Sequence, residues 1–352
     1  MAGLTEISYY GRKGITYGAI IMVILMLIPI TLRISKQIYL KLNPPPPPPP
    51  TTEYGKLPLL KFPQVEGVTP NTKPIYKLET ITGGLPQLPG VGKVYVVGIN
   101  KSRLLELERV KTRVRFLKFH DEPERLSENV FRFANSSPPT ELIADMVSGK
   151  FSYKLDFVSD PANFLPVSLP TVDQAASELK GFLGSMQSLS EDLANGIVKG
   201  KYLIATESGE MVESPSYSEA NMVRIDLFRA DKDKMAFVNG GGKTSTVNAL
   251  FSGVGDKLAR IVSINFAYSQ IVGEDFATYP LKSVDQAWSE LTQGKAYISK
   301  NISSVTVRRV SLAYYESDDL QAFVQPVFVF EGDEDFFAYV QAVDPKYLEE
   351  SK

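Results

Sequence analysis

The 352-residue sequence contains no cysteine, one histidine and one tryptophan. Without a thiol, the chain has no disulfide bond, no cysteine-ligated zinc or iron–sulfur cluster and no thiol nucleophile. This lack is compatible with any redox compartment. The single imidazole, His120 in "FHDEPERL", lacks the surroundings typical of a Ser-His-Asp triad or a histidine-rich metal site. We therefore expect it in an exposed loop or at a helix end.

An excess of basic residues is missing from most of the chain. The net charge is −2, but residues 1–43 carry five Lys or Arg side chains against one Glu, which leaves −6 for the remainder. Nucleic-acid-binding proteins usually present a basic face or stripe. The sequence therefore predicts no nucleic-acid partner.

One long hydrophobic run lies near the N-terminus. The segment "ITYGAIIMVILMLIPITL" has no charged residue, and 18 residues of helix span ~27 Å, close to a hydrocarbon core of ~30 Å. We predict an N-terminal tail over residues 1–14 and a transmembrane helix over residues 15–33. A cleaved signal peptide and a buried core helix are the alternatives, and no small-x-small cleavage site follows the run.

Proline dominates the next segment. Seven consecutive prolines occupy 44–50, and further prolines stand at 58, 63, 70, 74, 86 and 89. A proline run forms a stiff polyproline II rod at ~3.1 Å per residue. We predict an extended spacer over residues 34–90, with a PxxP ligand for an aromatic groove as the alternative.

Nine residues occur twice, as "TVDQAASEL" at 171–179 and "SVDQAWSEL" at 283–291, with seven of nine identical. Each copy begins with a capping-box pattern, in which a hydroxyl and a Gln three residues later satisfy each other's backbone N–H groups. Each also places an Asp in the first turn, where the helix dipole favours it. Both copies therefore predict a helix start, with Leu179 and Leu291 on the buried face and Trp288 in a core.

Strand-like segments rich in Val, Phe and Tyr follow each helix, separated by turn residues. A probable helix in "NKSRLLELERVKTRVRFLKF" with three strands after it forms a weaker third example upstream. We predict an α+β fold of tandem units, each an amphipathic helix on an antiparallel meander. Their predicted bounds are residues 91–165, 166–275 and 276–346.

Three segments resemble ligand-binding motifs but do not match them in detail. "NGGGKTST" at 239–246 would need Gly at 237 to be a P-loop, and Phe237 stands there, so we expect a hairpin turn. The acidic clusters "ESDD" at 316–319 and "EGDED" at 331–335 do not match a calcium loop, and we expect solvated hairpin turns. The sequence predicts no catalytic residue, no metal or cofactor-binding residue, no cofactor and no nucleotide.

Several segments resemble known proteins. "AWSELTQGKAYI", "VRRVSLAYY", "FVQPVFVFEG", "AYVQAV" and the earlier "GKLPLLKFP" are similar to uncharacterised single-pass envelope proteins of uncultured bacteria. More remotely, the helix-plus-meander unit resembles PepSY-type domains and the related YycI/YycH regulatory proteins. This resemblance implies a membrane-anchored, extracytoplasmic protein with an interaction, regulatory or protease-inhibitory role. No functional residue is carried over.

These patterns favour a non-enzymatic, membrane-tethered interaction or regulatory module at the cell envelope, held through residues 15–33 and bound to an unidentified envelope protein. We expect the large C-terminal part outside the membrane, although the Lys and Arg count after the helix leans the other way. A carbohydrate- or peptide-binding domain is the alternative if aromatic residues gather on an exposed face. A carboxylate-based hydrolase is another if two carboxylates line one pocket.

Overall fold

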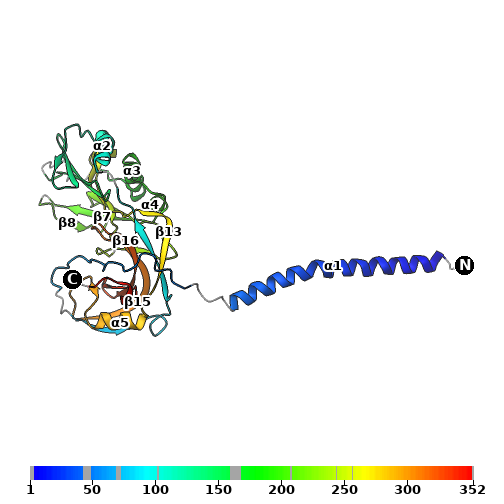
Figure 1. Cartoon of the computed structure of the whole chain (residues 1–352). Helices are drawn as coiled ribbons and strands as arrows, with labels where there is room; N and C mark the ends of the chain where they lie inside the picture. The colour runs from blue at the N-terminus through cyan, green and yellow to red at the C-terminus, as the bar shows by residue number, and fades with distance from the viewer. Residues whose placement is uncertain are drawn as a thin grey trace. The chain divides into compact units, whose positions relative to one another are not determined.

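The computed structural model describes residues 4–42, 49–68, 73–100, 103–158, 168–206, 208–242, 244–255 and 257–350. The chain divides into two units, residues 1–49 and residues 50–352. The first unit is the single helix α1 (Leu4–Leu42), in dark blue in Figure 1. Its segment Tyr17–Tyr39 has a mean hydropathy of 2.2 and none of it is buried. By length and composition, α1 can therefore span a membrane.

Helix α1 extends beyond the predicted span of residues 15–33 and ends at Leu42. The sequence between Arg33 and Leu42 contains neither Pro nor Gly and is rich in Lys, Leu, Ile and Gln, which a helix tolerates well. The proline run from Pro44 cannot continue the helix. The predicted spacer thus begins inside α1, and most of the proline run lies outside the described residues.

The second unit contains two sheets. The nine-stranded sheet has the order β3 (Glu124–Arg125), β4 (Val130–Ser136), β5 (Pro139–Asp145), β6 (Phe151–Leu155), β12 (Ile261–Phe266), β11 (Val247–Ser252), β9 (Met222–Leu227), β7 (Val198–Ala205), β8 (Met211–Glu213). The eight-stranded sheet contains β1 (Ile75–Leu78), β15 (Ser304–Tyr315), β16 (Phe323–Gly332), β17 (Phe337–Gln341), β14 (Tyr297–Ile298), β2 (Val91–Val97), β13 (Ile271–Pro280) and β10 (Phe237–Val238). The fold is therefore mixed α+β and mostly sheet.

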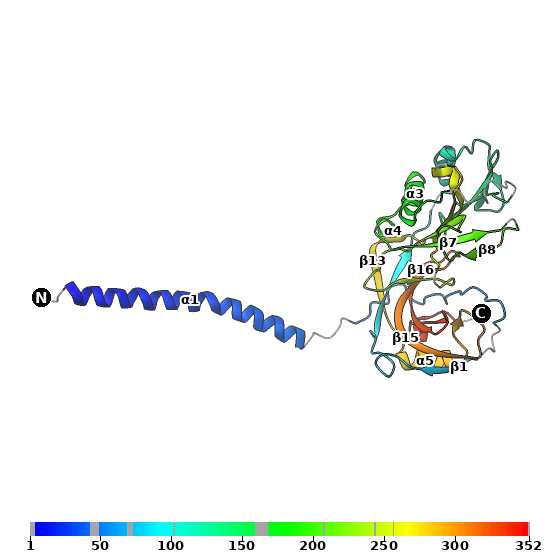
Figure 2. The same ribbon diagram turned by 180° about the vertical axis from the view of Figure 1, so that it is seen from behind.

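In the chain, the segment that forms the nine-stranded sheet lies between two strands of the eight-stranded sheet. Strand β2 leaves the eight-stranded sheet, residues 98–270 follow, and β13 returns to pair antiparallel with β2. Figures 1 and 2 show β13 leading from one sheet to the other. An arm, residues 228–242, runs back the other way, and its strand β10 pairs in parallel with β15. We call the two parts the nine-stranded lobe and the eight-stranded lobe.

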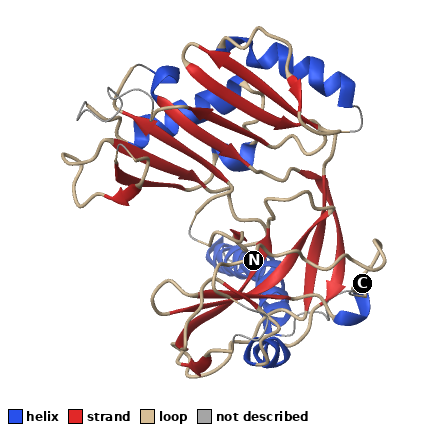
Figure 3. Cartoon of the chain, turned by 90° about the vertical axis from the view of Figure 1, so that its left-hand side faces the viewer, coloured by secondary structure: helices blue, strands red, loops and turns tan. Residues whose placement is uncertain are grey.

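Helices cover one face of the nine-stranded sheet (Figure 3). They are α2 (Arg103–Arg113), the 3-10 turn η1 (Val114–Leu117) and α3 (Val172–Ser185), with the short α4 (Glu191–Ala194) and η3 (Lys257–Arg260) nearby. Buried side chains of α2 and α3 form one core with the sheet. The eight-stranded lobe packs α5 (Val284–Thr292) in its core and ends in η4 (Pro345–Tyr347).

The two predicted helix starts are confirmed. Thr171 and Ser283 are the N-caps of α3 and α5, and each forms a complete capping box with the Gln three residues on. Leu179 and Leu291 have no exposed surface. Trp288 is half-buried against Phe330, with ring centroids 5.9 Å apart. The repeated nine residues therefore encode the same local structure twice.

The structure does not divide into three separate helix-plus-meander units. Strand β6 pairs with β12, which joins strands of the first and second predicted units into one sheet. Strand β2 lies inside the first predicted unit and β13 spans the predicted boundary between the second and third units, yet the two strands pair with each other in the eight-stranded sheet. The first and third units keep their expected meanders, β4–β5–β6 and β15–β16–β17, but the first of these is part of the larger nine-stranded sheet. The repetition is thus shown at the helix starts, where capping is local, and does not extend to the sheets.

Residues 50–68, predicted as part of an extended spacer, pack on the eight-stranded lobe. Leu57 is fully buried and bridges to Leu348 near the C-terminus. Phe62 stacks on Tyr297 with ring centroids 5.2 Å apart. Apolar side chains between the prolines give this segment a surface to bury, which a free spacer would lack. We call residues 50–68 the strap.

We predict that Leu291→Ala lowers the free energy of unfolding by about 2–5 kcal/mol, because it leaves a cavity in a fully packed core. Urea unfolding of the full chain in detergent, followed by circular dichroism, measures the change. The matched control is Leu104→Ala on α2, whose side chain is 79% exposed and should leave the midpoint nearly unchanged. Equal effects of the two variants would contradict the burial of Leu291.

Candidate functional site

A buried arginine stands where the two lobes meet. Arg229 lies at the base of the arm, directly after β9, and only 7% of its surface is exposed. Its Nη2 is 2.7 Å from the carboxylate of Asp192 on α4, and its Nη1 is 3.2 Å from that of Glu316. Glu316 follows β15, so the two carboxylates come from different lobes. One guanidinium therefore ties the lobes together.

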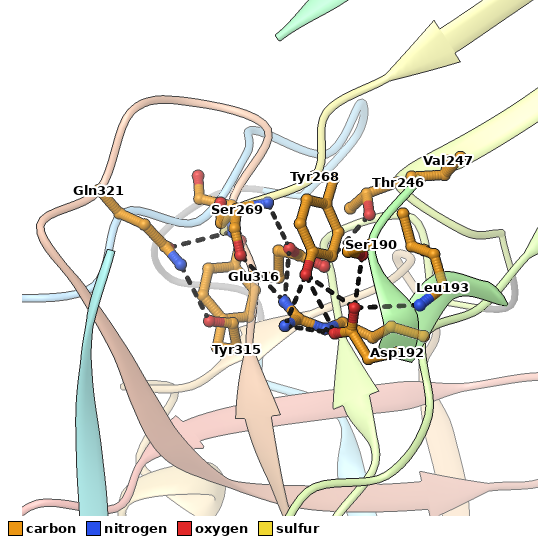
Figure 4. A network of polar contacts seen from close by, with 12 residues as sticks. Ser190, Asp192, Leu193, Thr246, Val247, Tyr268, Ser269, Tyr315, Glu316 and Gln321 are labelled. Atoms are coloured by element: carbon orange, nitrogen blue, oxygen red, sulfur yellow. Dashed lines mark hydrogen bonds and ion pairs between the residues drawn. The ribbon is translucent and has the colours of Figure 1, made fainter. Parts of the chain in front are cut away.

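Backbone and hydroxyl groups complete this arginine cluster, which we define as Asp192, Arg229, Tyr268 and Glu316. The N–H of Ser269 donates to Glu316 over 2.7 Å, and the hydroxyl of Thr246 donates to its other oxygen. The hydroxyl of Tyr268 donates to Asp192 over 2.9 Å. Figure 4 shows Asp192 and Glu316 with Tyr268 between them and Ser269 beside Glu316. All four carboxylate oxygens thus accept hydrogen bonds from the protein.

Aromatic rings enclose the guanidinium. Its central carbon lies 4.0 Å from the ring centroid of Phe237 on the arm and 4.5 Å from that of Tyr268. A cation over an aromatic face is attracted by the ring quadrupole, and more strongly where water is excluded. The rings therefore compensate part of the cost of burying this charge.

The two carboxylates respond to the shared arginine in opposite directions. Burial raises the pKa of Glu316 above its ordinary value, although Arg229 and the bonds from Ser269 and Thr246 act against the rise. Burial alone would also raise the pKa of Asp192, but the charge of Arg229 and the bonds from Ser190 and Tyr268 hold it below the ordinary value. One guanidinium balances one carboxylate, and the more deeply buried acid is the one that resists ionisation.

Two further polar contacts fix the lobes. The ammonium of Lys150, in the turn before β6, donates to the backbone carbonyls of Ser317, Asp318 and Asp319 at 2.7–2.8 Å. Burial lowers the pKa of Lys150, partly offset by nearby acids. The contact therefore clamps the β15–β16 hairpin of one lobe onto the other.

At the tip of the arm, Asp233 also fixes one part of the folded unit on another. Its carboxylate accepts hydrogen bonds from Tyr314 over 2.9 Å and from Lys93 over 2.6 Å, and a third comes from Tyr95. These three partners stand on β15 and β2. Asp233 thus anchors the arm on the eight-stranded sheet.

A cleft of about 570 Å³ lies beside the arginine cluster and shares Tyr268 with it. Ser190, whose hydroxyl donates to Asp192, also lines the cleft. Both chain crossings between the lobes border it, at residues 98–100 and 270–273. Its apolar lining includes Val110, Ala144, Phe151, Met186 and Phe266. Pockets of this size at junctions between folded parts are frequent ligand sites.

Charged residues of α2 form one wall of the cleft. Glu106 is only 6% exposed, and its two oxygens lie 3.4 Å from Arg109 and 2.9 Å from Arg113. Asp145 also borders the cleft, and its Oδ1 accepts the N–H groups of Val147 and Ser148. The arginine wall and the aromatic floor together make this cleft the candidate binding site.

A second groove, of about 710 Å³, lies beside the start of α5 and is more open to solvent. Residues 85–90 and 281–285 line it. Lys282 is the basic residue in the lining of this groove. Its side chain is buried and paired with Glu290 at 2.8 Å. This groove therefore offers no cation to a ligand, and we place the candidate site in the junction cleft.

His120 follows its prediction, and the glycine-rich stretch does so only in part. The stretch is not the expected hairpin turn, because β10 pairs with β15 whereas β11 pairs with β9 and β12. Residues 239–242 form a turn before strand β11, and no helix follows as a P-loop requires. A side chain at Gly242, which has a φ of +65°, would meet the ring of Phe337 at 2.0 Å. The glycine is thus needed for close packing. His120 is exposed in the loop after η1.

The two acidic clusters differ. Residues 333–335 are exposed in the β16–β17 hairpin, as predicted. Glu316 and Ser317 are buried, so the expectation of a solvated turn is wrong for them. The physical reason is the distant partner Arg229, which the local sequence does not reveal. Within the described residues, no group of three or more His, Cys, Asp or Glu side chains could hold a metal ion.

Comparisons with known proteins give little more. No protein-family model and no curated protein matches the chain. Among solved structures, an uncharacterized protein from Eubacterium rectale ATCC 33656 is similar over 75% of this chain and 80% of its own, with 12% identity and a TM-score of 0.39. A likeness at this level supports no conclusion about fold or function.

We expect Arg229→Met to lower the free energy of unfolding by about 3–5 kcal/mol, because it leaves two buried carboxylates without their cation. Urea unfolding of the full chain measures it. The control is Arg308→Met, whose half-exposed side chain pairs with Asp333 at the surface and should matter little. If both variants lowered the free energy of unfolding by a similar small amount, the cluster would not stabilise the fold.

The raised pKa of Glu316 predicts a pH effect. Because the folded state holds this proton more tightly than the unfolded state, stability should decline as the pH rises from 4.5, the ordinary value, through the raised pKa. In Glu316→Gln this decline is absent, whatever the variant's absolute stability. Unfolding free energies measured across that window give the slopes. Glu331→Gln on the next strand is the control, and identical slopes in all three proteins would refute the assignment.

Proposed function

We propose that the chain is a non-enzymatic, membrane-tethered interaction module of the cell envelope, with α1 in the membrane and residues 50–352 outside. The observation that carries this proposal is the saturation of the arginine cluster. Each oxygen of Asp192 and Glu316 already accepts at least one hydrogen bond from the protein. These bonds hold both side chains in fixed positions between the lobes, which is the arrangement of a structural cluster.

The tether is supported by α1 itself, since Tyr17–Tyr39 is apolar and unburied. The folded unit begins at Pro50, the last residue of the proline run, so that run connects α1 to the folded unit. Polyproline II is stiff and would hold a folded unit away from the bilayer. Outward placement suits such a rod, and large domains translocate largely regardless of flanking charge. The resemblance to PepSY-type and YycI/YycH proteins agrees with this placement.

The burial of the aromatic residues argues against a carbohydrate-binding face. The largest fully buried side chains are mostly Tyr and Phe, including Tyr95, Tyr279, Tyr314, Tyr315 and Tyr339. They pack in cores, whereas a sugar-binding face would expose them. A ligand is therefore more easily placed in the junction cleft.

One observation favours the hydrolase as a second candidate. Glu106 and Asp145 both line the junction cleft, as a carboxylate pair would require. Glu106, however, is bound to two arginines, and Asp145 is bound to its own turn. The hydrolase would require turnover of a peptide or glycoside that Glu106→Gln abolishes.

Membrane placement is tested by labelling, and the absence of native cysteine keeps the background clean. Ser303→Cys introduces a thiol at an exposed position of the folded unit. We expect it to react with a membrane-impermeant maleimide on intact cells. Ser8→Cys in the N-terminal tail is the matched control and should react only after lysis. The opposite pattern would place the folded unit inside and refute the proposal.

A further inference from the structure

The junction cleft combines an apolar floor with a cationic wall. Phe151 and Phe266 lie at its floor, stacked with ring centroids 4.8 Å apart and planes inclined by 17°. Both belong to adjacent strands of the nine-stranded sheet, β6 and β12. Asn100 and Gln270, at the two crossings, add side-chain amides to the rim. An apolar body with a few polar groups at one end matches this lining.

The wall carries more positive than negative charge. Arg109 and Arg113 stand four residues apart on α2, and the buried Glu106 lies between their guanidinium groups. One carboxylate neutralises one guanidinium, which leaves one positive charge at the wall. Arg109 is the group free to turn, since 65% of its side chain is exposed and its contact with Glu106 is the longer one at 3.4 Å.

Arg113 is held in place. Its Nη1 donates to Glu106 over 2.9 Å, and 22% of its side chain is exposed at the cleft. A guanidinium has five N–H donors in a planar arrangement. Among the residues that the structure describes, the bond to Glu106 is the only hydrogen bond that the side chain of Arg113 donates. The buried glutamate therefore orients an arginine whose remaining donors are available to a ligand.

The other charged groups near the cleft have partners within the protein. Asp145 is occupied by the N–H groups of its turn, and the ammonium of Lys150 lies close enough for the two charges to interact. Arg229 already contacts two carboxylates in the arginine cluster and is not available to a ligand. The charge left for a ligand is thus the single positive charge of the wall.

We propose that the junction cleft binds a monoanionic organic ligand, with its carboxylate on Arg113 and Arg109 and its apolar body on Phe151 and Phe266. The free C-terminus of a short apolar peptide has this chemistry. Arginine pairs with carboxylates through two parallel hydrogen bonds. A dianionic phosphate would exceed the one available charge. This inference rests on the proposal that the folded unit is a binding module, but not on its side of the membrane.

The probes are acetylated dipeptides of Phe, Leu and Val, each prepared with a free carboxylate and with a carboxamide. Isothermal titration of the full chain in detergent measures their binding. We expect at least one acid to bind, and its amide to bind at least tenfold more weakly. Arg113→Gln should weaken the acid at least tenfold and leave the amide unchanged. Arg132→Gln, an arginine on β4 paired with Glu124 and Glu141, is the matched control and should bind like the wild type.

A second variant protects the test against misfolding of Arg113→Gln. Val272, 48% exposed, lies at the rim of the cleft, and Val272→Trp should fill the entrance without touching the arginines. We expect it to weaken acid and amide alike. Equal binding of acid and amide, no binding of any acid up to millimolar concentration, or unchanged binding in both variants would overturn the inference. If the cleft fails while Ser303→Cys still labels from outside, the tethered module stands without this ligand.

Discussion

A single positive charge, that of Arg229, is excluded from water between two lobes that the chain builds from different segments. It contacts Asp192 on α4, the ring of Phe237 on the arm, and Glu316 at the end of β15. An unpaired charge in such a place costs several kcal/mol, so these elements must stay together whenever the protein is folded. The placement of the lobes, and therefore the cleft beside them, depends on this requirement.

The other contacts between the lobes depend on the direction of hydrogen bonds as well as on charge. Lys150 meets three backbone carbonyls, and Asp233 meets two tyrosine hydroxyls and a lysine. Apolar surfaces can slide past one another, whereas hydrogen bonds weaken steeply when their angle or length changes. The junction is therefore fixed in orientation. A ligand site that draws residues from both chain crossings profits from this rigidity, because its walls are already in place before binding.

Local patterns allowed the helix starts and most strands to be predicted, since a capping box and a Val- or Tyr-rich run act over a few residues. Sheet membership escaped prediction because the β6–β12 and β2–β13 pairs join distant parts of the chain. Glu316 looked like a solvated turn residue because its partner Arg229 lies 87 residues earlier. Likewise, Glu106 and its arginines have the spacing of an ordinary solvated helix face, and only the burial of Glu106 distinguishes them.

The insertion of one lobe into the other sets an order of folding during synthesis. Residues 98–270 carry every strand of the nine-stranded sheet, so this lobe can form as soon as that stretch has emerged. The eight-stranded sheet has to wait, because β1 and β2 pair with β15, β13 and β16, and Leu57 closes on Leu348. Until the last residues arrive, the strap and two unpaired strands remain open to aggregation. During synthesis, the early segments of this chain therefore stay unpaired for longer than its middle.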